Sequence, residues 1–380
     1  MSVVATPVWG DPAAWENPAP LRDTVDADVC VVGLGGSGLA AVGAALDAGA
    51  DVVGIDAGPV AAGAAGRNAG FLLAGGALFH HAAIEAWGEE RALGIYRESL
   101  GELDRLAAEL GDTIVRRAGS LRIPASEEEV EDCARQLAAL RRHGLPARRA
   151  DGRTGDGVFI PGDGSVQPLD RCRLLAGRAS ARGARLYCDT PAVALAGDRV
   201  GTPAGEVTCR AVVVCVDGGL ECLLPELAGR ARSARLQMLA TAPVAPGTIP
   251  CPVYDNWGYD YWQQLPDGGV ALGGGRGTYG DAEWGRPAEP SADVQALLDR
   301  LLRERVGVDA PVTHRWAGVI AYTDDRLPVL AEVRPGLLAV GAFSGHGNVL
   351  GSAAGRAAMA IAMGGPAPRL ARLLRPEHWG

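Results

Sequence analysis

The chain has 380 residues, which at about 150 residues per domain predicts two or three domains. Its hydrophobic fraction of 48% and charged fraction of 21% exclude an intrinsically disordered chain. The net charge of −9 argues against a nucleic acid as partner, and the absence of lysine among the 36 basic residues excludes catalysis by a lysine Schiff base.

The eight cysteines predict neither a disulfide framework nor a metal site. No C-x-x-C pair occurs, and the spacing of Cys215 and Cys222 suits neither zinc nor a redox pair. We therefore expect reduced, buried cysteines and no bound metal. The N-terminus has no basic stretch followed by an apolar one, so no signal peptide is expected and the predicted location is cytoplasmic.

Two uncharged runs, 29–46 and 335–355, are long enough to cross a membrane. In each, however, a short β-rich run gives way to glycines and then to a helix of small residues. This is the pattern of a buried strand, turn and helix, so we expect no transmembrane segment.

The first predicted elements are a buried strand over 27–32, a glycine-rich turn, a helix over 39–47 and a strand over 51–55, which together form a βαβ unit. Ser126 and Glu129 form a capping box that opens a helix ended by Gly144. Further apolar strands are predicted at 211–216 and 337–342, and a meander of short strands at 231–280. The remaining predicted helices cover 80–110, 168–182, 291–306 and 349–363.

The predicted parallel-sheet pieces fall at the start, in the middle and at the end of the chain. The nucleotide-binding domain is therefore expected to be discontinuous, over 1–78, 149–219 and 330–380, with a second domain over 79–148 and 220–329. The predicted fold class is α/β: a Rossmann-like domain plus an α+β domain with an antiparallel sheet.

The turn after the first strand fits the dinucleotide fingerprint G-x-G-x-x-G, with Gly33, Gly35, Gly36, Ser37 and Gly38. In this motif Gly33 permits the tight turn, Gly35 lets the backbone approach a pyrophosphate, and Gly38 lets helix and strand pack closely. Asp56, at the end of the second strand, is placed to accept hydrogen bonds from a ribose. A later glycine cluster at 273–277 does not open a predicted helix and is interpreted as a turn.

Three further segments resemble the D-amino-acid oxidase superfamily of FAD-dependent amine and amino-acid oxidoreductases. The first is the loop 63–70, with Arg67, Asn68, Ala69 and Gly70, in which Ala65 stands where the family has serine. The second joins Trp316-Ala-Gly318 to Thr323-Asp-Asp325-Arg-Leu-Pro328, and the third is Gly341-Ala-Phe-Ser-Gly345-His346-Gly347. The aromatic stretch 254–262 looks most like the gamma-glutamylputrescine oxidoreductase branch.

The resemblance implies FAD as cofactor. Binding would be non-covalent, because 313–322 lacks the cysteine through which some relatives tether their flavin. The residues implied to bind FAD are Gly33, Gly35, Gly36, Ser37, Gly38, Asp56, Ala57, Arg67, Asn68, Ala69, Gly70, Val193, Asp217, Gly218, Gly345, His346, Gly347 and Asn348.

The implied reaction is hydride transfer from an amine carbon to flavin N5, hydrolysis of the imine, and reoxidation by oxygen with release of peroxide. The alternatives are a D-amino-acid or glycine oxidase, a dehydrogenase that passes electrons to a quinone, and a flavin-bound protein without turnover. Relatives activate oxygen with a lysine, so His346 or Arg276 would have to supply the cation here. His346 is equally consistent with a packed structural imidazole.

Substrate contacts are expected from an aromatic run. On a strand, Trp257, Tyr259 and Tyr261 would share one face and could hold and desolvate an amine, although packing in the core explains the same pattern. The run 317–321 is apolar and has no arginine to pair an α-carboxylate, so an amine is favoured over an α-amino acid. Arg326 could provide that clamp, or be a surface arginine.

Overall fold

The computed structural model describes residues 3–152 and 155–374, in two compact units. The mixed-sheet unit comprises Met1–Gly10, Arg67–Gln167 and Ala234–Val319, and the parallel-sheet unit comprises Asp11–Gly66, Pro168–Ser233 and Ile320–Gly380. Residues 3–10, 67–78 and 149–167, which the sequence assigned to the nucleotide-binding domain, fall in the mixed-sheet unit. Residues 1–2, 153–154 and 375–380 of that predicted domain lie outside the described residues. Residues 220–233 and 320–329, which the sequence assigned to the second domain, fall in the parallel-sheet unit.

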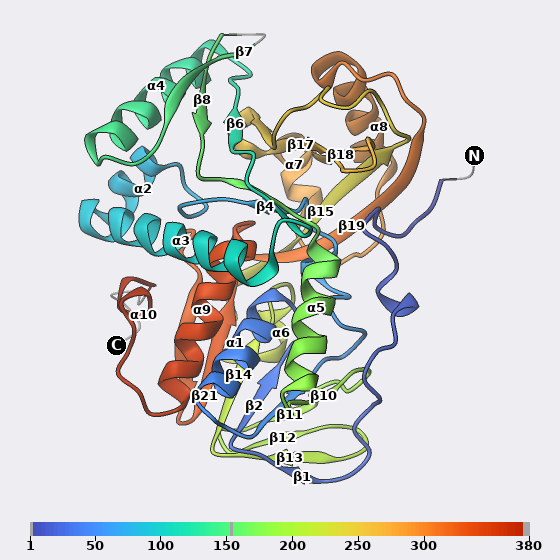
Figure 1. Cartoon of the computed structure of the whole chain (residues 1–380), viewed down its shortest axis with the longest axis vertical. Helices are drawn as coiled ribbons and strands as arrows, with labels where there is room; N and C mark the ends of the chain where they lie inside the picture. Colours follow the sequence, from blue (N-terminus) through green and yellow to red (C-terminus); the bar gives the residue numbers. More distant parts are fainter. Residues whose placement is uncertain (1–2, 153–154, 375–380) are drawn as a thin grey trace. The chain divides into compact units, whose positions relative to one another are not determined.

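The parallel-sheet unit is built on a six-stranded sheet (Figure 1). Its strand order is β10 (Arg185–Tyr187), β3 (Val52–Ile55), β2 (Val29–Val32), β14 (Ala211–Cys215), β21 (Leu337–Gly341) and β20 (Val329–Arg334). All neighbouring pairs are parallel except β20 with β21. The central strands are apolar at every position because both faces of the sheet are covered.

Helices cover one face of this sheet and a small sheet packs on the other. Helix α1 (Gly36–Asp47) lies between α5 (Pro168–Ala181) and α9 (Gly347–Ala362) (Figure 1). A Cβ at Gly355 of α9 would lie 2.2 Å from the carbonyl oxygen of Ser37, so α1 and α9 pack backbone to backbone. On the other face, Val200 and Val207 pack against the six-stranded sheet. They come from a four-stranded sheet of β1 (Val25–Asp26), β13 (Glu206–Thr208), β12 (Arg199–Gly201) and β11 (Ala194–Leu195).

The mixed-sheet unit contains an eight-stranded sheet. Its order is β19 (Val312–Thr323), β15 (Ala231–Thr241), β18 (Val270–Gly274), β17 (Asp260–Gln264), β16 (Val253–Asp255), β6 (Ser120–Arg122), β8 (Gly155–Ile160) and β7 (Arg148–Gly152). The strand registers described are antiparallel apart from that of β16 with β6, which is parallel. A three-stranded sheet joins β4 (Phe71–Leu72), β9 (Gly164–Val166) and β5 (Val115–Arg116).

Helices cover the strands of this unit. Helix α8 (Ala292–Leu301) buries Val294 and Leu298 against β18, and α4 (Glu127–Arg142) buries Leu137 and Leu140 against β8. Helices α2 (His80–Trp87) and α3 (Glu89–Leu110) complete the layer around α4. The predicted fold class, a Rossmann-like domain plus an α+β domain, is confirmed.

Local predictions differ from the structure in four places. The single helix predicted over 80–110 is broken at Gly88, whose φ of +82° ends α2. The helix predicted over 291–306 ends in a π-helical turn at Leu302–Val306. The glycine cluster 273–277 opens a one-turn helix, α7 (Arg276–Tyr279), where only a turn was expected. Cys222 lies exposed on α6 (Leu220–Leu223), whereas a buried residue was expected.

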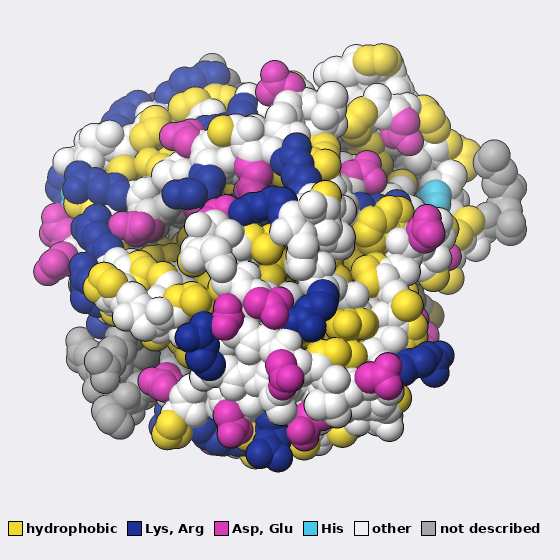
Figure 2. Space-filling model, turned by 60° about the horizontal axis from the view of Figure 1, so that its bottom comes forward, with side chains coloured by type: hydrophobic (Ala, Val, Ile, Leu, Met, Phe, Trp, Pro, Cys, Tyr) yellow, Lys and Arg dark blue, Asp and Glu magenta, His cyan; other side chains and the backbone are white. Residues whose placement is uncertain are grey.

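Charges of both signs are interspersed on the face shown in Figure 2. At the surface of the parallel-sheet unit, Arg185 pairs with Asp51 at 2.7 Å and Arg182 with Asp47 at 2.8 Å. Within 3–152 and 155–374, none of the helices combines the length and the apolar character needed to span a membrane.

Candidate functional site

The predicted dinucleotide turn joins β2 to α1. Gly33 has a φ of +104°, and a Cβ there would lie 2.4 Å from the carbonyl oxygen of Cys215. A Cβ at Gly38 would lie 1.8 Å from the carbonyl oxygen of Gly33, so these two glycines are required by the fold itself. At Gly35, which caps α1, a Cβ would meet only the methyl group of Ala65, at 3.1 Å. Gly35 therefore leaves the helix N-terminus accessible to an anion, as a bound pyrophosphate requires.

Asp56 directly follows β3, as the sequence predicted, and its carboxylate supports the turn. Its Oδ2 accepts the N–H of Leu34 at 2.6 Å and its Oδ1 accepts the N–H of Gly58 at 3.1 Å. Ala57 lies between Asp56 and Gly58 in the chain. Burial raises the pKa of Asp56. Each carboxylate oxygen keeps a second lone pair, so the group can still accept hydrogen bonds from ribose hydroxyls.

Arg171 of α5 joins the N-terminal turns of α1 and α9, and the sequence gave no role to it. Its side chain is 1% exposed, and its guanidinium lies 3.3 Å from where a Cβ of Gly36 would stand. Its Nη1 donates to the carbonyl oxygen of Asn348 at 2.9 Å, and its Nη2 donates to the hydroxyl of Ser352. One buried cation thus links the glycine fingerprint to the C-terminal motif Gly345-His346-Gly347.

The C-terminal motif forms a strained turn before α9. Ser344 and Gly345 have φ of +52° and +92°, and His346 caps the helix. The Nδ1 of His346 is buried and makes no hydrogen bond to any described residue. An unsatisfied imidazole nitrogen beside a helix N-terminus fits the polar edge of a flavin.

The charge state of His346 narrows its possible roles. Burial lowers the pKa of His346 to about 4, so the imidazole is neutral at neutral pH. A neutral imidazole offers a hydrogen-bonding nitrogen and not the positive charge considered for this residue.

Asp217 follows β14 and supports the turn before α9 through a hydrogen bond to its backbone. Its Oδ1 accepts the N–H of Phe343 at 3.0 Å, and burial raises the pKa of Asp217 to about 7. Gly218 comes next in the chain and is partly buried. The ring of Phe343 in turn covers the first turn of α9, because a Cβ at Gly347 would lie 2.9 Å from it.

We expect Asp217→Asn to gain stability relative to the parent protein as pH rises. The folded pKa near 7 exceeds the ordinary value of 3.8, so the parent loses stability between those two pH values and Asn does not. Between pH 5 and 8 the difference in unfolding free energy should move by about 2 kcal/mol in favour of Asn. Urea unfolding at both pH values measures it. The exposed Asp324→Asn is the control, and equal shifts in the two variants would contradict the assignment.

The loop 67–70 and the Trp316 motif meet in the mixed-sheet unit although they are far apart in the sequence. Trp316 is buried and donates its indole N–H to the carbonyl oxygen of Arg67 at 2.9 Å, and Nη1 of Arg67 donates to the carbonyl oxygen of Ala317 at 3.2 Å. Asn68 Oδ1 accepts the N–H of Gly70, whose φ is +72°. The carbonyl oxygen of Ala69 accepts a hydrogen bond from Gln263 Nε2.

The predicted aromatic face is only partly correct. Tyr261 lies on β17, where its ring meets Phe71 edge-on at 6.1 Å between centroids. Trp257 and Tyr259 precede the strand: Trp257 lies in a turn with a φ of +53°, and Tyr259 is 39% exposed. The three residues therefore do not share a face by strand alternation, because the chain turns at 256–258. The sequence predicted only a helix-capping role for Glu129. In the structure its carboxylate also accepts the N–H of Trp257 at 2.8 Å.

The remaining predicted residues have the following positions. Arg276 begins α7, and its guanidinium stacks 4.5 Å from the ring centroid of Trp284. Arg326, with a φ of +64°, lies over the ring of Tyr322 at 4.9 Å. Val193 is 65% exposed beside β11. Arg276 belongs to the mixed-sheet unit, and Arg326 and Val193 belong to the parallel-sheet unit.

Sequence reasoning missed Arg171, Glu129 and Gln263 as contributors to these motifs. One signal was present for Arg171, because it falls on the apolar face of its helix with Leu169, Cys172 and Leu175. Gln263 and Glu129 gave no comparable signal, since their partners lie 194 and 128 residues away in the chain.

Comparison with known proteins agrees with this geometry. The family model described as "FAD dependent oxidoreductase" (DAO) matches residues 28–361. Gamma-glutamylputrescine oxidoreductase of Escherichia coli (strain K12) is 28% identical over 371 residues, covering 88% of this chain and 83% of the relative. The probable oxidoreductase OrdL of Rhizobium meliloti (strain 1021) is 26% identical over 366 residues, covering 89% and 83%.

Glycine oxidase from Geobacillus kaustophilus has the same fold, with a TM-score of 0.75 at 21% identity, covering 90% of this chain and 95% of that one. The family match extends over the glycine fingerprint, the loop 67–70, the Trp316 motif and the turn before α9. The chain therefore belongs to the DAO family of FAD-dependent oxidoreductases.

Proposed function

We propose that the protein oxidises a C–N bond of a small amine whose carboxylate, if it has one, lies far from the reacting carbon. The observation that carries the proposal is the composition of residues 254–264, which form β16, the turn and β17. They contain three tyrosines, two tryptophans and two aspartates, and no basic residue. The two aspartates are buried and bonded within the protein, so the accessible aromatic residues Trp257, Tyr259 and Tyr261 are the groups that would hold the amine, by cation–π attraction. Their rings would also lower the pKa of the amine by desolvation, which favours the neutral donor form.

Two further points support an amine. The relative gamma-glutamylputrescine oxidoreductase is named for an amine substrate. The residues Ala317, Gly318, Ile320 and Ala321 of β19 are buried and apolar, and leaving an α-carboxylate unpaired beside them would cost several kcal/mol. Arg326 is the residue that favours the alternative, a D-amino-acid or glycine oxidase or dehydrogenase, since it follows β19 by three residues.

The proposed reaction balances as amine plus oxygen giving imine plus hydrogen peroxide, with water then hydrolysing the imine. Bound FAD supplies the two-electron acceptor between amine and oxygen. The N-termini of α1 and α9 would bind it, the first at the pyrophosphate and the second at the ring, together with the glycines of the two motifs. We propose that this binding is non-covalent, in which case acid precipitation releases the yellow chromophore into the supernatant.

The test is anaerobic reduction of the flavin, followed by absorbance, with diamines, gamma-glutamylated amines, glycine, D-alanine and L-alanine. We expect at least one amine to reduce the flavin more than tenfold faster than any of the amino acids. Arg326→Ala should leave amine oxidation unchanged. Faster reduction by glycine or D-alanine, lost in Arg326→Ala, would establish the alternative.

Peroxide formation in air distinguishes oxygen from a quinone as the electron acceptor. Comparing the peroxide formed by the parent and Arg276→Ala proteins tests whether Arg276 is the cation of the oxygen step.

A further inference from the structure

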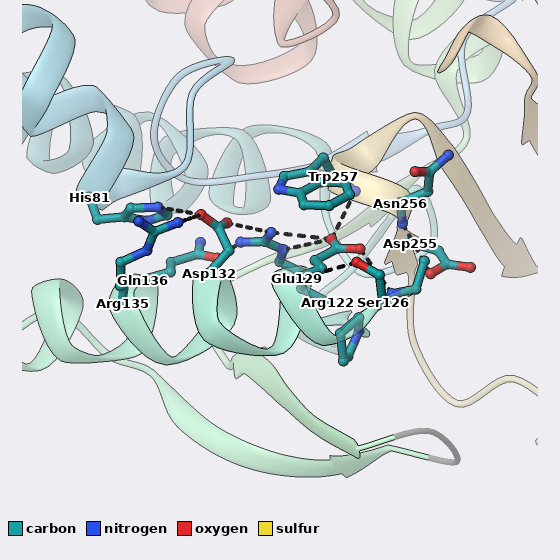
Figure 3. A network of polar contacts seen from close by, with 12 residues as sticks. His81, Arg122, Ser126, Glu129, Asp132, Arg135, Gln136, Asp255, Asn256 and Trp257 are labelled. Atoms are coloured by element: carbon teal, nitrogen blue, oxygen red, sulfur yellow. Dashed lines mark hydrogen bonds and ion pairs between the residues drawn. The ribbon is translucent and has the colours of Figure 1, made fainter. Parts of the chain in front are cut away.

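We propose that Glu129 is a positioning residue for the amine site: its buried carboxylate fixes the turn that presents Trp257 and Tyr259. This inference rests on the proposed function, because it takes the turn 256–259 as part of the amine site. Glu129 lies in the first turn of α4, and the turn it holds connects β16 to β17 in the same unit (Figure 3).

The turn has a costly backbone. Asn256, Trp257 and Gly258 have φ of +52°, +53° and +81°, which places three consecutive residues in the left-handed region. Glycine adopts this conformation freely and asparagine tolerates it, but for a residue as large as tryptophan it is a genuine outlier. Such residues cost about 1–3 kcal/mol each and persist where surrounding contacts hold them. Folding alone would be served better by glycine at 257.

Glu129 supplies the contact that holds Trp257. Its Oε1 accepts the N–H of Trp257 at 2.8 Å, and its Oε2 accepts the N–H of Ala125 at 2.9 Å. The Glu129 N–H in turn donates to the hydroxyl of Ser126, the helix cap, at 3.2 Å. The side chain is 0% exposed, so the carboxylate has few alternative positions. A single buried acid therefore couples the start of α4 to the aromatic turn.

Arg122 compensates the buried charge of Glu129. Its Nη2 lies 3.2 Å from Glu129 Oε1 and 2.6 Å from Asp132 Oδ2, and its Nη1 donates to Gln136 at 2.6 Å. The guanidinium also stacks 3.5 Å from the ring centroid of Phe79. A buried carboxylate is tolerated when it is paired in this way, and the pairing fixes its orientation (Figure 3).

The far side of the turn is fixed independently. The Asn256 side chain donates to Asp260 Oδ2 at 3.1 Å, and Arg305 binds both oxygens of Asp255 at 2.5 and 2.7 Å. Between these supports Tyr259 is 39% exposed and Trp257 is partly exposed. A strained backbone held at both ends, with its large aromatic side chains left accessible, indicates binding rather than core packing.

The experiment measures the apparent Kd of the amine and the limiting rate of flavin reduction, using the fastest amine of the panel and the FAD-loaded protein. Trp257→Ala defines the contribution of the turn. We expect Glu129→Ala to raise the Kd about tenfold with the limiting rate changed less than threefold. The double variant should be no worse than the worse single one, because both changes act on the same contact. Glu129→Gln keeps an acceptor for the Trp257 N–H and should restore most of the affinity.

Glu128→Ala is the matched control, since Glu128 is the exposed neighbour in the same helical turn. Glu129→Asp keeps the charge beside Arg122 but is too short to reach the N–H of Trp257, so it should raise the Kd as Glu129→Ala does. It tests the proposal even if Glu129→Ala does not fold. An unchanged Kd in Glu129→Asp, while Trp257→Ala raises it, would overturn the positioning role and leave the amine site standing. An unchanged Kd in Trp257→Ala would overturn both.

Discussion

Gly35→Val should leave the protein unable to retain FAD. Gly35 caps α1, and among the described residues the Ala65 methyl, at 3.1 Å, is the only atom beyond its chain neighbours within 4 Å of a Cβ added there. A branched side chain there would fill the volume that a pyrophosphate needs. We expect the affinity for FAD to fall at least 100-fold, which corresponds to about 2.7 kcal/mol. The flavin-to-protein absorbance ratio after gel filtration and titration of the apoprotein with FAD measure the loss.

Two controls distinguish loss of the pyrophosphate site from general destabilisation of α1 and from the clash with Ala65. Gly43→Val makes the same change in the same helix, at a position where a Cβ meets no atom within 4 Å, and should retain FAD. Adding Ala65→Gly to Gly35→Val removes the contact within the protein and should not restore binding if the pyrophosphate is the group displaced. Stoichiometric FAD in Gly35→Val, or full rescue by Ala65→Gly, would contradict the assignment.

The parallel-sheet unit was predictable because its signals are local. Each central strand is a continuous apolar run, the turn after β2 needs glycine at 33 and 38 for steric reasons, and Asp56 closes β3. Hydrophobic pattern and turn chemistry agree at these positions, so the order of strands and helices follows from short stretches of sequence. The sequence predicted a ribose-binding role for Asp56 but not its structural role, in which the carboxylate accepts the N–H groups of Leu34 and Gly58 and so holds the turn.

The aromatic turn was mispredicted because its conformation is imposed from a distance. Alternation of aromatic residues at 257, 259 and 261 favours a strand, and no local rule places tryptophan in a left-handed turn. The conformation depends on Glu129, 128 residues earlier in the chain. Half of the predicted capping box is present: Ser126 Oγ accepts the N–H of Glu129, but Glu129 Oε2 accepts the N–H of Ala125 and not that of Ser126. A cap motif does not reveal that the same carboxylate has a second, tertiary partner.

Arg171→Met should weaken FAD binding about tenfold or more. Arg171 belongs to neither of the two glycine motifs, but it contacts the N-terminal turns of both α1 and α9. The guanidinium bonds the carbonyl oxygen of Asn348 and the hydroxyl of Ser352 in α9 while touching Gly36 in α1. It therefore sets the spacing of the two turns that would hold the pyrophosphate and the flavin ring, and adds positive potential beside both helix dipoles. Methionine keeps the length of the side chain but removes the charge and the donors. The exposed Arg178→Met, two turns further along α5, is the control and should bind FAD normally.

Gly36→Ala distinguishes this role from general destabilisation. In the parent protein an added Cβ at position 36 would stand 3.3 Å from a guanidinium that is bonded to α9 and cannot easily move. A flexible methionine at 171 can yield to the same methyl group. We therefore expect Gly36→Ala to reduce FAD affinity more in the parent than in Arg171→Met, a coupling of the kind that a double-mutant cycle isolates. If Arg171→Met only loosened the core, the two losses would add. Additive losses, or FAD affinity in Arg171→Met equal to that of the Arg178 control, would show that the arginine serves packing alone.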